Sequence, residues 1–175
     1  MKRLALLFGA LTLAGCDLNL SDLGYCEYSR DFSDEISASG LSSLLADVQA
    51  GDLRIEGHSG SNHVRVHARA CARSRRTSED IDFALQRDGG AATVTSYVPS
   101  YDDARLDLVL EVPADFDIDV YDGSGDIDVR NVYSVWIDDG SGDIYVEDLD
   151  GDFVVYRDGS GRIDYRNVRG LVQLP

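Results

Sequence analysis

Lysine is almost absent from this chain of 175 residues: Lys2 is the only one, and the other bases are arginine. Beyond position 2 the chain therefore excludes Schiff-base and lysine general-base chemistry. Proline is also scarce, with 3 residues, and glutamate contributes only 6 of the 32 acids against 26 aspartates. Because Asp is a poor helix former and Glu a good one, this choice disfavours a helical protein.

The excess of acid over base excludes a further class of function. With 32 acidic and 16 basic residues, the formal net charge is −16 at pH 7. Such a chain repels nucleic-acid phosphates, so DNA and RNA are excluded as partners. The aspartates occur together with 17 glycines, and both residue types favour turns. Many turns between short strands predict an all-β protein.

Residues 1–15 have the features of a processed export signal. Lys2 and Arg3 precede an apolar stretch, residues 4–13, that is too short to span a bilayer. The stretch ends in Leu13-Ala14-Gly15-Cys16, which resembles the lipobox of bacterial lipoproteins. That resemblance implies cleavage before Cys16, lipidation of Cys16 and anchoring in the bacterial cell envelope. An ordinary secretory signal is the alternative.

Processing would change the charge and the cysteine count. Removal of residues 1–15 takes away two bases, so the net charge of −16 becomes −18. We expect residues 16–24 to form a lipidated tether and the membrane to be a partner through the lipid. Asp17 resembles an inner-membrane retention signal, but inner and outer membrane, and a periplasmic or surface-exposed position, stay open. Lipidation leaves Cys26 and Cys71, which we expect to form a disulfide, the alternative being two buried thiols.

The C-terminal half contains an internal repeat. Its three copies each begin with Asp-Gly-Ser-Gly, and they occupy residues 122–129, 139–146 and 158–165 at nearly constant spacing. A fainter copy occupies residues 51–55. Each copy continues with apolar residues at every second position, which is typical of a half-buried strand.

We predict that residues 25–175 form one all-β domain, a parallel β-solenoid with rungs of 17–19 residues. Stacked rungs would align isoleucines 127, 144 and 163 inside, and would place Arg157 and Arg166 beside Asp138 and Glu147 outside. The alternative is an antiparallel β-sandwich, because each Asp-Gly is also suited to a two-residue hairpin turn.

One stretch has a family resemblance. Residues 106–113 lead through Asp117-Ile118-Asp119-Val120 into the repeats, and this pattern resembles the bacterial "putative adhesin" family of domains of unknown function. The resemblance covers roughly residues 40–175, and implies a β-solenoid on an exported or membrane-anchored protein. The family brings no established catalytic residues, so the resemblance implies none here.

The repeated aspartates are candidate calcium ligands, because Ca²⁺ takes six to eight oxygen ligands. The candidates are Asp122, Asp126, Asp139, Asp143 and Asp158. The repeat does not match the calcium-binding nonapeptide, since Ile127 stands where that motif needs aspartate. Solvated turn aspartates are therefore the default interpretation, and we expect no other cofactor.

These observations favour a non-enzymatic envelope lipoprotein that presents an acidic β-solenoid surface to an envelope protein or glycan. Candidate contact groups are Tyr121, Tyr133, Tyr145 and Trp136. The alternative is a carbohydrate-active β-helix enzyme that uses rung carboxylates such as Asp126 and Asp143. A basic cluster, Arg65 to Arg76, either offsets the acidic half of the chain or docks an acidic partner or headgroup.

Overall fold

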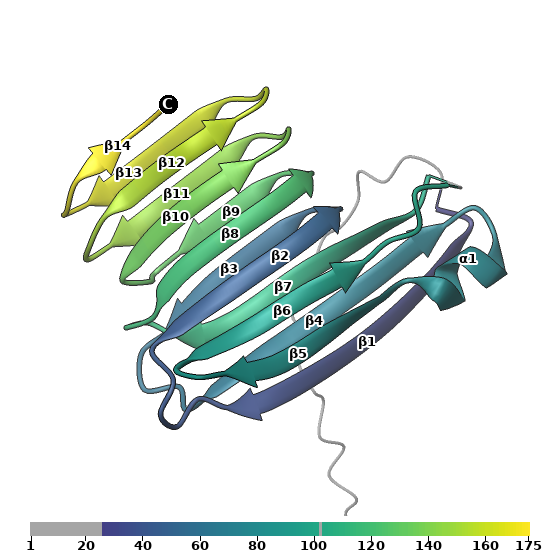
Figure 1. The fold of residues 1–175 in the computed structure, drawn as a ribbon, viewed down its shortest axis with the longest axis horizontal. Coiled ribbons are helices and arrows are strands. Elements are labelled where there is room, and N and C mark those ends of the chain that lie inside the picture. The colour runs from purple at the N-terminus through teal and green to yellow at the C-terminus, as the bar shows by residue number, and fades with distance from the viewer. Residues whose placement is uncertain (1–25, 102) are drawn as a thin grey trace, which may run out of the picture.

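The computed structural model describes residues 26–101 and 103–175, which form two seven-stranded β-sheets and one short helix (Figure 1). The strands of sheet A, in spatial order, are β1 (Tyr28–Ser37), β4 (His63–Ala72), β7 (Arg105–Pro113), β3 (Leu53–His58), β9 (Ile127–Arg130), β11 (Ile144–Leu149) and β13 (Ile163–Val168). Those of sheet B are β14 (Val172–Gln173), β12 (Phe153–Asp158), β10 (Ser134–Asp139), β8 (Asp117–Ser124), β2 (Ser43–Ala50), β6 (Ala91–Tyr97) and β5 (Asp82–Asp88). The predicted all-β class is confirmed.

The repeats stack in the predicted register. Each repeat gives one strand to sheet B and the next to sheet A, as the alternation of β8 to β13 in Figure 1 shows. In sheet A, Ile144 lies opposite Ile127 on one side and Ile163 on the other, with parallel strands. The aligned isoleucines point between the sheets and build the core. The faint upstream copy is a true rung, because Leu53 aligns with Ile127.

The predicted parallel solenoid over residues 25–175 is wrong as a description of the whole, because both sheets are mixed. Strand β4 pairs antiparallel with β1 and β7, and β5 pairs antiparallel with β6. The short turn at Gly89 and Gly90 requires this reversal, since a parallel connection needs a much longer crossover. The fold is a two-layer, sandwich-like arrangement, yet the purely antiparallel sandwich is also incorrect, since β8 to β14 pair only in parallel.

Sequence order and spatial order differ at one place. Strands β2 and β3 lie between the β6–β7 pair and the β8–β9 pair, so each is paired on both sides. The chain therefore completes its N-terminal strands on one side of β2–β3 and adds its repeats on the other. We call β2–β3 the central rung.

Glycine at the repeat turns allows the rungs to approach closely. Gly125, Gly142 and Gly161 occupy equivalent positions and have φ of 138°, 146° and 154°. A Cβ atom on any of them would collide with the carbonyl oxygen of the glycine in the rung below, Gly51 in the case of Gly125. The turn position therefore requires glycine for two reasons, the backbone conformation and the absence of a side chain.

The last repeat neutralises the one before it. Arg157 lies 2.7 Å from the Asp138 carboxylate, Arg162 lies 2.8 Å from Asp143, and Arg166 and Arg169 pair with Glu147 and Asp150. The predicted pairing of opposite charges on neighbouring rungs is thus confirmed. The arginine of each pair is largely exposed, so solvent screens the interaction and it contributes little to stability.

The N-terminal strands are joined by the predicted disulfide. Cys26 and Cys71 are bonded, and their Cα atoms are 5.5 Å apart. After β4, Ser74 caps helix α1 (Arg75–Asp80) by accepting the backbone N–H of Thr77 at 3.1 Å. Within the described ranges no helix is long and apolar enough to cross a membrane. The expected signal, Cys16 and the tether lie outside the described residues.

Candidate functional site

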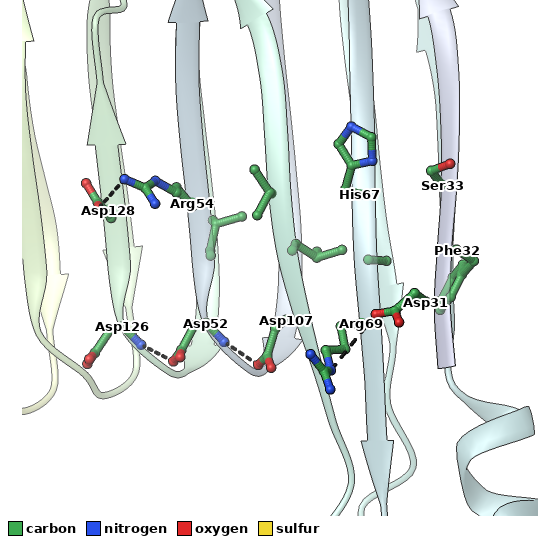
Figure 2. Close-up of a pocket in the computed structure, with 14 residues that line it drawn as sticks. Asp31, Phe32, Ser33, Asp52, Arg54, His67, Arg69, Asp107, Asp126 and Asp128 are labelled. Atoms are coloured by element: carbon green, nitrogen blue, oxygen red, sulfur yellow. Dashed lines mark hydrogen bonds and ion pairs between the residues drawn. The ribbon is translucent and has the colours of Figure 1, made fainter. Parts of the chain in front are cut away.

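A groove of about 830 Å³ crosses the outer surface of sheet A (Figure 2). Three consecutive residues come from each of β1, β4 and β7 and from the start of β3, and β9 completes the groove together with the turn that precedes it. The lining residues are Asp31, Phe32, Ser33, Asp52, Leu53, Arg54, His67, Ala68, Arg69, Asp107, Leu108, Val109, Asp126 and Asp128. The groove therefore combines segments that lie far apart in the sequence.

Strand periodicity determines which of these side chains face outward, where a ligand can reach them. Leu53 and Leu108 are buried in the core, so their neighbours on either side face outward. As a result two rows of polar side chains run across the strands, one at the level of Asp52 and one at the level of Arg54, as Figure 2 shows. The groove lies between these rows.

The first row is built by hydrogen bonds between a carboxylate and the backbone of the next rung. Asp107 accepts from the backbone N–H of Asp52 at 3.1 Å, and Asp52 accepts from that of Asp126 at 3.1 Å. Asp126 then accepts from Asp143 at 2.9 Å, and Asp143 from Arg162 at 2.9 Å. We call these four aspartates the aspartate ladder. Because each bond uses one oxygen, the second oxygen of the exposed Asp52 and Asp126 is available to a ligand.

The second row contributes hydrogen-bond donors. The Arg54 guanidinium lies 3.8 Å from the Asp128 carboxylate, which Arg130 also binds through two hydrogen bonds of 2.7 and 2.8 Å. The exposed imidazole of His67 continues the row across β4 (Figure 2). At the β1 end of the first row, Arg69 lies opposite Asp107 and 3.9 Å from Asp31. Five aspartates against two arginines still leave the groove net acidic.

Asp107 is the most buried acid of the groove. Burial raises the pKa of its carboxyl, while the hydrogen bond from the Asp52 backbone and the nearby Arg105 guanidinium oppose that shift. Its Oδ2 lies 3.6 Å from Arg105 and has no hydrogen-bond partner among the described residues. The first row thus contains one partly desolvated acceptor, the Asp107 carboxylate.

The five calcium candidates fall into two separate columns. Asp126 and Asp143 belong to the aspartate ladder at the outer surface of sheet A. Asp122 and Asp139 align in sheet B with their side chains turned inward, and Asp158 continues that column. Within residues 26–101 and 103–175, no three acidic, histidine or cysteine side chains are arranged to hold a metal ion.

The inward column is electrostatically unusual. Asp122 is 6% exposed and Asp139 is fully buried. Burial, together with the neighbouring Asp139 carboxylate, raises the pKa of Asp122 to about 8. Burial likewise raises the pKa of Asp139. The column is therefore partly protonated at neutral pH, which the default interpretation as solvated turn aspartates did not anticipate.

The other predicted contact groups lie on different surfaces. Tyr121 and Trp136 point outward from neighbouring strands of sheet B, whereas Tyr145 belongs to sheet A. There the Tyr145 hydroxyl donates to Glu147 at 3.0 Å, and Arg130 and Arg166 approach the ring. These aromatic residues do not form one contact patch.

The basic cluster is mostly neutralised within the chain. Arg65 binds Glu35 at 2.8 Å and Glu111 at 3.3 Å. Arg73 and Arg75 pair with Asp103 and Glu79. This arrangement agrees with the interpretation that the cluster offsets nearby acids.

Sequence reasoning did not find the groove, although a signal was present. Arg54, Val109 and His67 each flank a core position by one residue, and this alternation could have placed them on one face. The neighbourhood of β1, β4, β7 and β3 was the missing information, because their spatial order departs from the sequence order.

Comparisons with known proteins do not assign this chain to a family. No family model matches the chain, and no curated protein matches it. Among solved structures, a "putative cell adhesion protein" from Clostridium sporogenes matches 84% of this chain and 99% of its own length, at 9% identity and TM-score 0.43. A "putative lipid binding protein" from Parabacteroides distasonis matches 82% of this chain and 61% of its own length, at 11% identity and TM-score 0.47. A "putative adhesin" from Bacteroides fragilis has 8% identity, TM-score 0.28, and coverage of 83% and 97%. At these values neither the fold nor the function of these proteins transfers to this chain.

Proposed function

We propose that this protein is a non-enzymatic, lipid-anchored binding module of the bacterial cell envelope, and that its groove on sheet A binds an envelope glycan. The groove itself supports this proposal most directly, since acceptors of the aspartate ladder face donors from Arg54 and His67 across a single depression. Sugar hydroxyls donate and accept hydrogen bonds, so they can satisfy both rows. The resemblance of residues 13–16 to a lipobox and the disulfide of Cys26 with Cys71 support an exported, anchored protein.

The rung carboxylates support binding better than hydrolysis. Glycoside hydrolysis needs one carboxyl group that is protonated at working pH. The Arg162 guanidinium holds the pKa of Asp143 below its ordinary value, so Asp143 is an anion at neutral pH. Asp126 and Asp143 also fix the backbone of the next rung, which gives both a structural role.

Photocrosslinking in intact cells would test the location of the contact. A diazirine amino acid at Val109, which lies between Arg54 and His67 in the second row, should give a glycan adduct, because that position lines the groove. The same residue at Thr95, exposed on sheet B, is the matched control. Lysine-directed reagents are unsuitable because a chain cleaved before Cys16 has no lysine. Equal labelling from both positions, or labelling of protein alone at Val109, would contradict the proposal.

An arginine variant would test the donor row. Arg54→Ala should weaken glycan binding about tenfold, because a charge-assisted hydrogen bond contributes about 1.5 to 3 kcal/mol. Arg76→Ala makes the same change on an exposed position of α1 and should leave binding unchanged. Affinity is measured by calorimetry with glycan fragments released from the envelope. If both variants bind like the wild type, the groove is not the binding site.

A further inference from the structure

Both ends of the paired sheets have edge strands, but the two ends differ in how the core between the sheets is covered. At one end β1 and β5 run antiparallel to their neighbours, and Phe32 of β1 stacks on Phe83 of β5 with ring centroids 5.3 Å apart. At the other end β13 and β14 are the last strands of their sheets (Figure 1). Among the described residues nothing pairs with the outer edge of β13.

The apolar core reaches the surface at this open end. In sheet A, a column of core-facing residues runs from Val129 through Val146 to Tyr165. Val129 and Val146 are fully buried, whereas Tyr165 is 47% exposed. Leu171 and Leu174, immediately before and after β14, are also exposed. Among residues 26–101 and 103–175, nothing covers the apolar groups of this outermost layer, whereas each inner layer is covered by the next rung.

The hydrogen bonds between β11 and β13 show which backbone groups of β13 point toward its free edge. The carbonyl oxygen of Arg162 accepts from the backbone N–H of Ile144 at 2.8 Å, so the backbone of Arg162 points toward β11. Because alternate residues of a strand point their N–H and C=O to opposite sides, those of Ile163, Tyr165 and Asn167 point to the open side. An open edge of this kind is a template for another strand.

The outward side chains of β13 are self-complementary. Asp164 and Arg166 flank Tyr165 and both are exposed, while within the chain Arg162 lies 3.7 Å from Asp164 and Arg166 binds Glu147. If an identical strand pairs antiparallel with Tyr165 opposite its own copy, each Asp164 lies opposite the Arg166 of the partner strand. If the two-fold axis lay at residue 164 or 166, one strand would move by two residues and place Asp164 opposite Asp164, or Arg166 opposite Arg166. Opposite charges favour the first register and like charges disfavour the other two.

We infer that a second copy of this chain binds at β13, so that the two β13 strands pair antiparallel across a two-fold axis at Tyr165 and join the two copies of sheet A. The pairing satisfies the free backbone groups and covers the Tyr165 ring with its symmetry mate. It also forms two identical Asp164–Arg166 pairs, as an interface with two-fold symmetry requires. The groove lies over β1, β4, β7, β3 and β9, away from this edge, so the dimer leaves it open.

Cysteine crosslinking of the full chain in its native membrane would test the axis. Directly opposite residues of a hydrogen-bonded antiparallel pair have Cα atoms about 5.5 Å apart, within the range of a disulfide. Tyr165→Cys should therefore give a disulfide-linked dimer on a non-reducing gel. Tyr156→Cys, another exposed tyrosine but on β12, is the control and should stay monomeric. A folded Tyr165→Cys protein without a dimer band, or equal bands from both variants, would overturn the proposal.

Charge variants would test the register. In the Tyr165→Cys background, Asp164→Arg places arginine opposite Arg166 twice and should lower the crosslinked fraction about tenfold. Arg166→Asp should do the same through two pairs of aspartates. Co-expression of the two charge variants restores both opposite-charge pairs in the mixed dimer, and the crosslinked fraction should return. Melting curves verify that each variant folds; if Arg166→Asp does not, the Asp164→Arg chain alone decides. An unchanged dimer band with Asp164→Arg would refute this register.

Discussion

Replacement of Gly142 by alanine is expected to cost more than about 4 kcal/mol of unfolding free energy, enough to leave much of the protein unfolded. Gly142 has φ of 146°, a conformation that L-residues rarely adopt. An added Cβ would also collide with the backbone carbonyl of Gly125 in the neighbouring rung. The turn that contains Gly125 is packed between the turns of two neighbouring rungs, so its carbonyl cannot move without displacing another rung.

Urea unfolding followed by circular dichroism would measure this effect. Gly90→Ala is the matched control, because Gly90 lies in the turn before β6 and a Cβ there meets nothing within 4 Å. We expect the control to change stability by less than about 0.5 kcal/mol. Similar unfolding midpoints for the two variants would show that close stacking of the turns does not hold the repeats together.

Asp122→Asn is expected to stabilise the protein at pH 8 by about 4 kcal/mol and to have little effect near pH 4. The pKa of Asp122 rises from an ordinary 3.8 to about 8, and each pKa unit is worth a little over 1 kcal/mol. Because the folded state holds this proton more tightly than the unfolded state, its contribution is fully present below pH 3.8. It is lost as the pH rises toward 8. Asparagine is neutral throughout and its amide can donate to Asp139.

The test compares unfolding free energies of wild type and variant from pH 4 to 8. The difference between them removes the contribution of acids such as Glu147, whose pKa Arg166 lowers and which change stability in the opposite direction in both proteins. It reports Asp122 together with the neighbouring Asp139 carboxyl. Asp115→Asn makes the same change at an exposed position between β7 and β8 and is the control. A pH dependence of Asp122→Asn no larger than that of the control would mean that the buried aspartates of sheet B are hydrated and ionised.

Much of the repeat region could be predicted because its evidence is local. A turn motif that recurs at nearly constant spacing fixes which side chains align, and strand periodicity fixes which of them point inward. Isoleucines 127, 144 and 163 therefore align as predicted, and Arg166 lies beside Glu147. Both the register and the charge pairing follow from the spacing of the repeats.

The arrangement of the N-terminal half could not be predicted from such evidence. Residues 51–55 resemble a repeat, but nothing in their sequence indicates that they stack between β7 and β9. Hydrophobic periodicity predicts which side of a strand faces the core. It does not predict which distant strand will pair with it. The groove depends on this pairing, so it was missed with it.

Asp122 and Asp126 have different roles, which strand periodicity in the sequence could have distinguished. Asp122 shares its alternation phase with Ile118 and Val120, which are buried, so period two already predicts an inward carboxylate. Asp126 lies four residues further on, beyond the Gly-Ser-Gly turn, and is exposed. Treating both as turn residues joined them in one calcium hypothesis, whereas the structure separates them into a buried column and an outer ladder.

The position of the central rung has a consequence for how the molecule folds. Strands β8 and β9 need β2 and β3 as a template, and these lie about seventy residues earlier in the chain. Each later repeat pairs with the repeat directly before it in the sequence, but the first repeat can pair only after the distant strands β2 and β3 have formed. A chain cut between the halves would therefore leave the repeats without their template. The protein is expected to unfold as one cooperative body, without the independent fraying typical of repeat arrays.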